Sequence, residues 1–130
     1  MIREANIYDI PRMNELGSLL EENFSKVYSI SEMLEDNISK VFVYEKDDQV
    51  VGFILATDLQ ETCDILSVVV DPNYRRMKIA SNLIDYLISD LDENLKLITL
   101  EVSTKNTPAL KLYDQFGFEV VNIRKKYYQN

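Results

Sequence analysis

Hydrophobic residues change their spacing several times along the chain, and each spacing predicts a secondary-structure element. Residues 1–6 predict a short strand, after which Asp9 is suited to cap a helix that carries Pro11 in its first turn. Ser29 and Glu32 have the spacing of a capping box at the start of a second, shorter helix. The apolar residues of the first predicted helix recur at helical spacing; they are Ile10, Met13, Leu16, Leu20 and Phe24. Those of the second predicted helix are Met33, Leu34 and Ile38.

The pattern then becomes typical of β-strands. Residues 41–44 are β-branched or aromatic, the two aspartates at 47–48 signal a turn, and residues 49–56 complete a predicted hairpin. Residues 65–70 are apolar at nearly every position, which indicates a strand covered on both faces. The Asp-Pro pair at 71–72 ends that strand.

Helices and strands alternate in the rest of the chain. Residues 77–91 predict a long amphipathic helix, and residues 96–102 predict another buried strand. A strand, a long helix and a second apolar strand imply a parallel crossover. Pro108 is placed to begin a last helix that Gly117 ends, and residues 118–128 predict the final strand. The expected fold class is α/β, with a mixed sheet that is antiparallel at first and parallel at its centre.

The composition narrows the possible chemistry. A chain of 130 residues with 46% hydrophobic and 28% charged residues is expected to form a single domain over residues 1–130. The chain has no histidine and one cysteine, which excludes histidine-based triads and makes a metal site unexpected. Cys63 cannot form an intrachain disulfide, which fits a cytoplasmic location, and it is interpreted as a packing residue rather than a reactive thiol.

Charge and hydropathy exclude two classes of partner. A net charge of −8 disfavours non-specific nucleic-acid binding, although it could favour a basic partner or simply maintain solubility. No window approaches the 18 consecutive apolar residues of a membrane-spanning helix. The expectation is therefore a protein that binds neither nucleic acid nor membrane.

The first candidate site lies between the strand at 65–70 and the long helix. The N-terminus of a helix offers free backbone N–H groups and a partial positive charge, which suit a phosphate group. Arg75, Arg76 and Lys78 add three positive charges in this acidic chain. A solvated basic turn explains the same charges equally well.

The second candidate site lies in residues 100–118. Glu101 is placed at the carboxyl end of a central parallel strand, where ligands gather in open α/β sheets. Tyr113 lies on the following predicted helix, about one turn before its end. Taken singly, Glu101 could be a solvated carboxylate at a strand end, and Tyr113 could be a packing residue.

Together, these segments resemble the GNAT superfamily of N-acetyltransferases, and within it the RimI-type branch, which acetylates the N-terminal alanine of a ribosomal protein. The family's phosphate-binding pattern V-x-P-x-x-R-x-x-G-x-G/A is similar to residues 70–80, and its N-x-x-A-x-x-L-Y-x-x-x-G-F pattern is matched over residues 106–118. The sequence Leu100-Glu101-Val102 and residues 123–128 favour the RimI-type branch. The resemblance covers the C-terminal half well and the first half only in the order of elements.

The resemblance implies a GNAT fold with a six-stranded mixed sheet and about four helices, and acetyl-CoA as the acetyl donor. It makes Glu101 the general base, acting directly or through a water, and Tyr113 the general acid, with Asn106 bonded to the pantetheine arm. The backbone of three strand residues would bind the pantetheine arm and the oxyanion; these are Val68, Val69 and Val70. The pyrophosphate would be held by Arg75, Arg76, Met77, Lys78, Ile79, Ala80 and Ser81.

Two departures from the family pattern lead to further expectations. Lys78 stands where the family usually has glycine, and with a negative φ it could still present its N–H to phosphate, whereas its side chain could crowd the cofactor. The family normally continues into a seventh strand, but this sequence stops at Asn130. The sixth strand is therefore expected to lack its usual neighbour and to be shielded in a homodimer.

The resemblance leaves the acceptor open. The leading hypothesis is a protein N-terminal amine, in which case Tyr127 and Tyr128 could line a peptide groove or could be ordinary strand residues. A small-molecule amine is the second hypothesis. A non-catalytic relative that binds CoA or a protein is the third.

Overall fold

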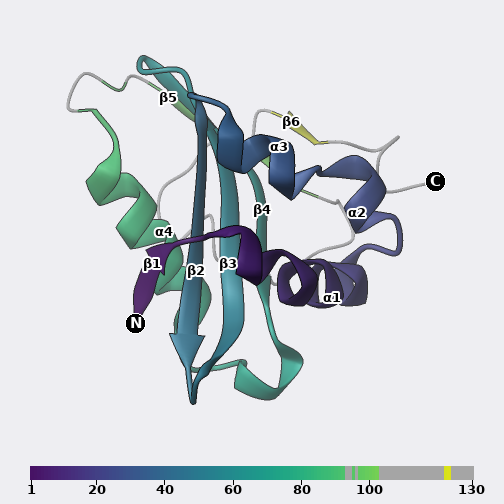
Figure 1. Ribbon diagram of the computed structural model, residues 1–130. Coiled ribbons are helices and arrows are strands. Elements are labelled where there is room, and N and C mark those ends of the chain that lie inside the picture. The colour runs from purple at the N-terminus through teal and green to yellow at the C-terminus, as the bar shows by residue number, and fades with distance from the viewer. Residues whose placement is uncertain (93–94, 96, 103–121, 124–130) are drawn as a thin grey trace.

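Six strands form one mixed sheet in the computed structural model, which describes residues 1–92, 95, 97–102 and 122–123. The strands lie side by side in chain order, antiparallel from β1 to β4 and parallel from β4 to β6 (Figure 1). Their bounds are β1 Ile2–Glu4, β2 Ser39–Lys46, β3 Gln49–Asp58, β4 Thr62–Val70, β5 Leu97–Val102 and β6 Asn122–Ile123. The predicted α/β class and the mixed six-stranded sheet are confirmed.

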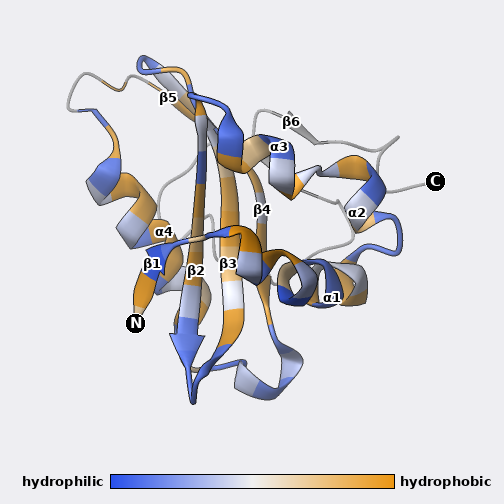
Figure 2. Ribbon diagram, viewed as in Figure 1, coloured by the Kyte–Doolittle hydropathy of each residue, from blue (hydrophilic) through white to orange (hydrophobic). Residues whose placement is uncertain are grey.

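Helices cover both faces of this sheet. The described helices are η1 Ile7–Asp9, α1 Ile10–Leu20, α2 Phe24–Val27, α3 Ile30–Glu35, η2 Pro72–Tyr74 and α4 Ile79–Asp90, of which η1 and η2 are 3₁₀ helices. Helices α1, α2 and α3 lie on one face and α4 lies on the other (Figure 1). Because β3 is covered on both sides, its hydrophobic colouring is nearly continuous along the strand (Figure 2).

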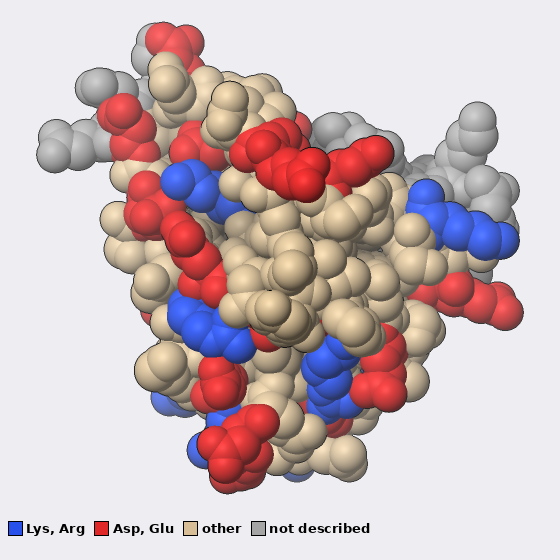
Figure 3. Space-filling view, viewed as in Figure 1, with Lys and Arg blue, Asp and Glu red and all other residues tan. Residues whose placement is uncertain are grey.

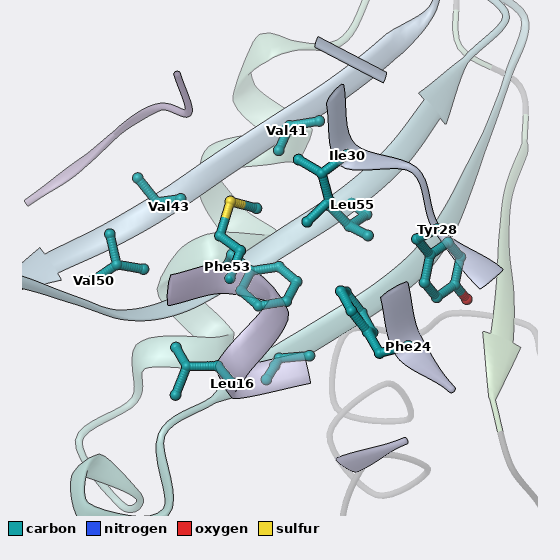
Figure 4. Packing of buried hydrophobic residues seen from close by; sticks show 11 residues of the cluster. Leu16, Phe24, Tyr28, Ile30, Val41, Val43, Val50, Phe53 and Leu55 are labelled. Atoms are coloured by element: carbon teal, nitrogen blue, oxygen red, sulfur yellow. The ribbon is translucent and has the colours of Figure 1, made fainter. Parts of the chain in front are cut away.

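Two hydrophobic clusters fill the layers on either side of the sheet. Along β3, side chains alternate between them, so that Phe53 and Leu55 face α1 while Ile54 and Ala56 face α4. In the cluster on the α1 side of the sheet, the rings of Phe24 and Phe53 pack edge to face with their centroids 5.6 Å apart (Figure 4). This alternation fixes the register of β3, since a slip of one residue would exchange the two sets of side chains.

The predicted first helix is split in two. Helix α1 ends at Leu20, and the chain is extended at Glu21 before α2 begins at Phe24. A methyl group on Gly17 would lie 2.4 Å from ring carbons of Phe24, so α1 and α2 meet at a position where only glycine leaves room. The prediction that Phe24 continues the first helix is wrong, and so is the inclusion of Ile38, which lies beyond the end of α3. Both residues follow the helical spacing of their neighbours without belonging to the same helix.

The predicted caps are also corrected. Asp9 stands at the N-cap of α1, but its carboxylate makes no cap bond there. Instead it accepts hydrogen bonds from the Asn6 backbone N–H and from the Arg3 guanidinium, because Asn6 and Asp9 form a capping box for η1. Ser29 likewise stands at the N-cap of α3 without a side-chain cap bond. The observed capping box therefore belongs to η1, and not to α3, where Ser29 and Glu32 predicted it.

Other predictions are confirmed. Asp47 and Asp48 have φ angles of 55° and 62° and connect β2 to β3, as a two-residue hairpin loop requires. Cys63 is fully buried in the cluster under α4, and burial, together with the neighbouring carboxylates Asp58 and Asp64, raises the pKa of its thiol to about 12. A thiol with so high a pKa is a poor nucleophile, so Cys63 is a packing residue.

Candidate cofactor site

The central strands β4 and β5 are paired only along the first half of β4. Their parallel pairing runs from Thr62 with Leu97 to Ile65 with Leu100. Beyond that point β4 continues to Val70, whereas the next residues of β5 pair with β6. Among the described residues, the stretch 66–70 of β4 therefore has a backbone partner only on its β3 side. A strand edge of this kind can bind an extended ligand through main-chain hydrogen bonds.

A β-bulge lies where the two strands separate. Leu55 pairs with Ser67 and Ala56 with Ile65, so Leu66 is an extra residue in β4. The hydroxyl of Tyr28, a buried residue that ends α2, donates a hydrogen bond of 3.0 Å to the Leu66 carbonyl. Bulges bend a strand and redirect its backbone groups, so this contact helps to fix the open edge. Neither the bulge nor the role of Tyr28 was found from the sequence, because the run of apolar residues shows no break at Leu66.

The three valines of the open edge turn their side chains into the core. Val69 packs in the cluster under α1, and Val68 and Val70 pack against the cluster under α4. The predicted role of these residues rests on their backbone, and their side chains leave that backbone edge free. At Gly52, the partner of Val70, a methyl group would lie 2.9 Å from Ile79 Cγ2, so the start of α4 packs directly on the sheet.

The segment from Asp71 to α4 forms the second part of the site. Arg76 and Lys78 have φ angles of 67° and 60°, while Met77 between them does not have a positive φ. When successive residues alternate between right-handed and left-handed backbone conformations, their N–H groups form a concave arrangement that can bind an anion. Lys78 therefore does not have the negative φ under which a lysine was expected to present its N–H, and glycine suits this position because it adopts the left-handed conformation without strain.

The N-terminus of α4 adds donors next to this segment. Its N-cap, Lys78, makes no side-chain cap bond, and the first backbone bond of the helix runs from the Asn82 N–H to the Lys78 carbonyl. The N–H groups of residues 79–81 therefore have no partner within the helix, and they form the positive end of the helix dipole. The Ile79 side chain is buried, so only its backbone is available to a ligand.

The basic side chains of this segment differ from Arg3, Arg12 and Lys40. On the face in Figure 3, acidic atoms border most of the basic ones, and Arg3, Arg12 and Lys40 each form ion pairs. By contrast, no ion pair joins three exposed cations to other described residues; these are Arg75, Arg76 and Lys78. Their charges are available to an anionic ligand.

The predicted catalytic residues are only partly covered by the structure. Glu101 is the first residue of β5 after its last pair with β4, and its backbone pairs with Asn122 of β6. It therefore lies where the strands separate, as its position in the sequence suggested. Tyr113 and Asn106 lie outside the described residues, as do the predicted last helix, most of the final strand and residues 127–128.

Two further observations concern metals and membranes. Within the described part of the chain, no group of three or more His, Cys, Asp or Glu side chains could hold a metal ion. None of the described helices is long and apolar enough to cross a membrane.

An open central strand next to an uncapped helix N-terminus is an α/β arrangement that suits an extended ligand with an anionic end. The sequence pattern of the acetyltransferase (GNAT) family matches residues 5–118. The chain therefore belongs to the GNAT family. Its relatives include the ribosomal protein bS18-alanine N-acetyltransferase of Haemophilus ducreyi, with 34% identity over 86 residues. That match covers 65% of this chain and only 59% of the relative.

A second relative matches over nearly the whole chain. The N-alpha-acetyltransferase of Sulfurisphaera tokodaii is 30% identical over 142 aligned positions, which cover 98% of this chain and 84% of the relative. Among solved structures, the PaiA N-acetyltransferase of Thermoplasma acidophilum in complex with coenzyme A superimposes with a TM-score of 0.78. It is 18% identical and covers 92% of this chain and 89% of its own, a likeness that concerns the fold alone.

Proposed function

We propose that this protein is an acetyl-CoA-dependent N-acetyltransferase whose acceptor is the N-terminal α-amine of a protein. The observation that carries the proposal is the open edge of β4 at residues 66–70, which is followed by residues 71–78 and the uncapped N-terminus of α4. A pantetheine arm needs an extended edge, and a pyrophosphate needs convergent N–H donors, in that order along the ligand. Membership of the GNAT family supports the same assignment.

In this proposal, the two parts of CoA bind to different chemical groups. The pantetheine arm pairs with the backbone of residues 68–70 and with Asn106. The pyrophosphate accepts hydrogen bonds from backbone N–H groups of residues 76–81, and the exposed side chains of Arg75, Arg76 and Lys78 supply positive charge. Affinity for the pyrophosphate should therefore fall as the salt concentration rises.

The proposed reaction is a direct transfer. The neutral nitrogen of the acceptor amine forms a bond to the thioester carbonyl carbon, and Glu101 accepts the proton that this nitrogen loses as the bond forms. A backbone N–H of residues 68–70 stabilises the negative charge that develops on the carbonyl oxygen. The carbon–sulfur bond breaks, and Tyr113 donates a proton to the departing thiolate. In a chain without histidine, a carboxylate and a phenol are natural groups for these two proton transfers.

The choice of an α-amine rests on the relatives and on proton affinity. Two relatives carry names that specify alanine or α-amino acetylation. An α-amine has a pKa of about 8, against about 10.4 for lysine, so a larger fraction is already neutral at physiological pH. A larger share of α-amine molecules can therefore attack without first losing a proton than is the case for a lysine side chain.

Two measurements test the proposal in sequence. Calorimetric titration of CoA into the purified chain should show binding; its absence at millimolar ligand would refute the cofactor assignment. Release of free thiol from acetyl-CoA should then be measured with peptides that present different N-terminal residues, and in parallel with polyamines, amino acids and aminoglycosides. Preference for peptides supports the α-amine proposal, preference for a small amine contradicts it, and binding without turnover indicates a non-catalytic relative.

A further inference from the structure

Arg12, on the first turn of α1, joins three parts of the molecule. Its Nη2 donates a hydrogen bond of 2.7 Å to Asp71 Oδ2, and its Nε donates one of 2.9 Å to the Val50 carbonyl at the start of β3. Its Nη1 pairs with the exposed carboxylate of Glu15. Arg12 and Asp71 are 59 residues apart in the sequence, so this contact exists only in the folded chain.

Asp71 is the junction between β4 and the segment that leads into α4. It is 6% exposed, and its second carboxylate oxygen, Oδ1, accepts a hydrogen bond of 2.9 Å from the Asn73 N–H. Its own N–H donates to the Val51 carbonyl, and its carbonyl accepts from the Tyr74 N–H. One carboxylate oxygen thus holds η2, while the other is held by Arg12.

The far end of η2 is anchored by the β2–β3 hairpin. The Tyr74 hydroxyl donates a hydrogen bond of 3.0 Å to Asp47 Oδ2 and accepts one of 3.1 Å from Gln49 Nε2. Residues 75–78, which carry the two left-handed conformations, follow immediately. Their placement relative to the open edge of β4 is therefore determined by the two anchors of η2.

We infer that Arg12 is a positioning residue, which acts through Asp71 to hold residues 75–78 in the conformation that binds the CoA pyrophosphate. The inference rests on the proposed function for the identity of the ligand. Arg12 is too well occupied by protein groups to contact the cofactor, so its influence passes through the Asp71 carboxylate. Without the guanidinium, a buried carboxylate would lose its charged partner and turn toward water, and it would release its bond to the Asn73 N–H.

The protein contains a matched control. Arg3 and Asp9 form a second arginine–carboxylate pair, also at the start of α1, and their side chains are 29% and 8% exposed. The corresponding values for Arg12 and Asp71 are 28% and 9%. The two pairs are therefore alike in burial, but Arg3 lies on β1 at the edge of the sheet, and its hydrogen bonds to described residues go to Glu4, Asp9 and Glu45 rather than to η2.

The experiment compares Arg12→Gln with Arg3→Gln in the full chain. Both variants should lose thermal stability. Only Arg12→Gln should weaken CoA binding in calorimetric titration and raise the KM for acetyl-CoA, each by roughly tenfold, because affinity falls with the fraction of molecules in the binding conformation. The kcat at saturating acetyl-CoA should remain within about twofold of the unsubstituted protein, since the reacting groups are untouched.

Three outcomes would overturn the inference. The first is that Arg12→Gln binds CoA as tightly as the unsubstituted protein. The second is that Arg3→Gln weakens CoA binding as much as Arg12→Gln does. The third is that Arg12→Gln lowers kcat and leaves KM unchanged. If Arg12→Gln does not fold, Arg12→Lys is judged by the same criteria. Failure of the unsubstituted protein to bind CoA would instead refute the proposed function, which separates that failure from the failure of the Arg12 inference alone.

Discussion

Replacement of Lys78 by glycine should stabilise the protein. Lys78 has φ 60° and ψ 24°, is exposed, and makes no cap bond with its side chain. The left-handed conformation costs a residue with a Cβ about 1–2 kcal/mol, which Lys78→Gly would remove. Against this, glycine makes the unfolded chain more flexible, at a cost of about 0.4–1 kcal/mol. The difference predicts a net stabilisation of roughly 0.5–1 kcal/mol.

Arg75, three residues before Lys78, provides the control. Arg75 is also basic and exposed, but its φ is −67°, so Arg75→Gly removes the same charge without relieving a left-handed conformation. It should destabilise the protein by about 0.4–1 kcal/mol. Urea unfolding at equal m-values measures both changes as shifts of the midpoint. Equal destabilisation by the two substitutions would refute the claim that Lys78 is held in a costly conformation.

Three further predictions concern the core, a buried carboxylate and the proposed base. Gly17→Ala should destabilise the protein by about 1–3 kcal/mol in urea unfolding, because the added methyl group would overlap the Phe24 ring, and an unchanged midpoint would contradict the packing of α1 on α2. The Arg3 guanidinium holds the pKa of Asp9 below its usual range, so its contribution to stability is present above about pH 3.9, the unfolded value, and is lost as the pH falls through the lower folded value. Asp9→Asn should therefore flatten the loss of stability in acid, and an unchanged acid profile in thermal unfolding would contradict this. Glu101→Gln should lower turnover by roughly 10²–10⁴-fold with CoA binding intact, and undiminished turnover across the pH range would contradict its role as base.

Several elements could be predicted from the sequence because their causes are local. The two aspartates at 47–48 specify a tight hairpin loop, and the spacing of apolar residues between 79 and 87 specifies the buried face of α4. Prediction from residue spacing failed where another polar group competed for the same atoms. Asp9 was expected to cap α1, but its carboxylate is bound to Arg3 of β1 and to η1.

The sequence by itself determined the order of the described strands, the long helix α4 with the basic segment before it, and the motifs that place the chain in its family, since each depends on residues that are neighbours along the chain. Only the tertiary structure decided that β4 separates from β5 after Ile65, that Leu66 forms a bulge, and that Lys78 adopts a positive φ. It also decided that Arg12 meets Asp71 across 59 residues. Such features depend on contacts between residues that are far apart in the sequence, because a buried polar group must find a hydrogen-bond partner and a buried side chain must fit its neighbours. The spacing of residues along the chain does not show which residues those partners are.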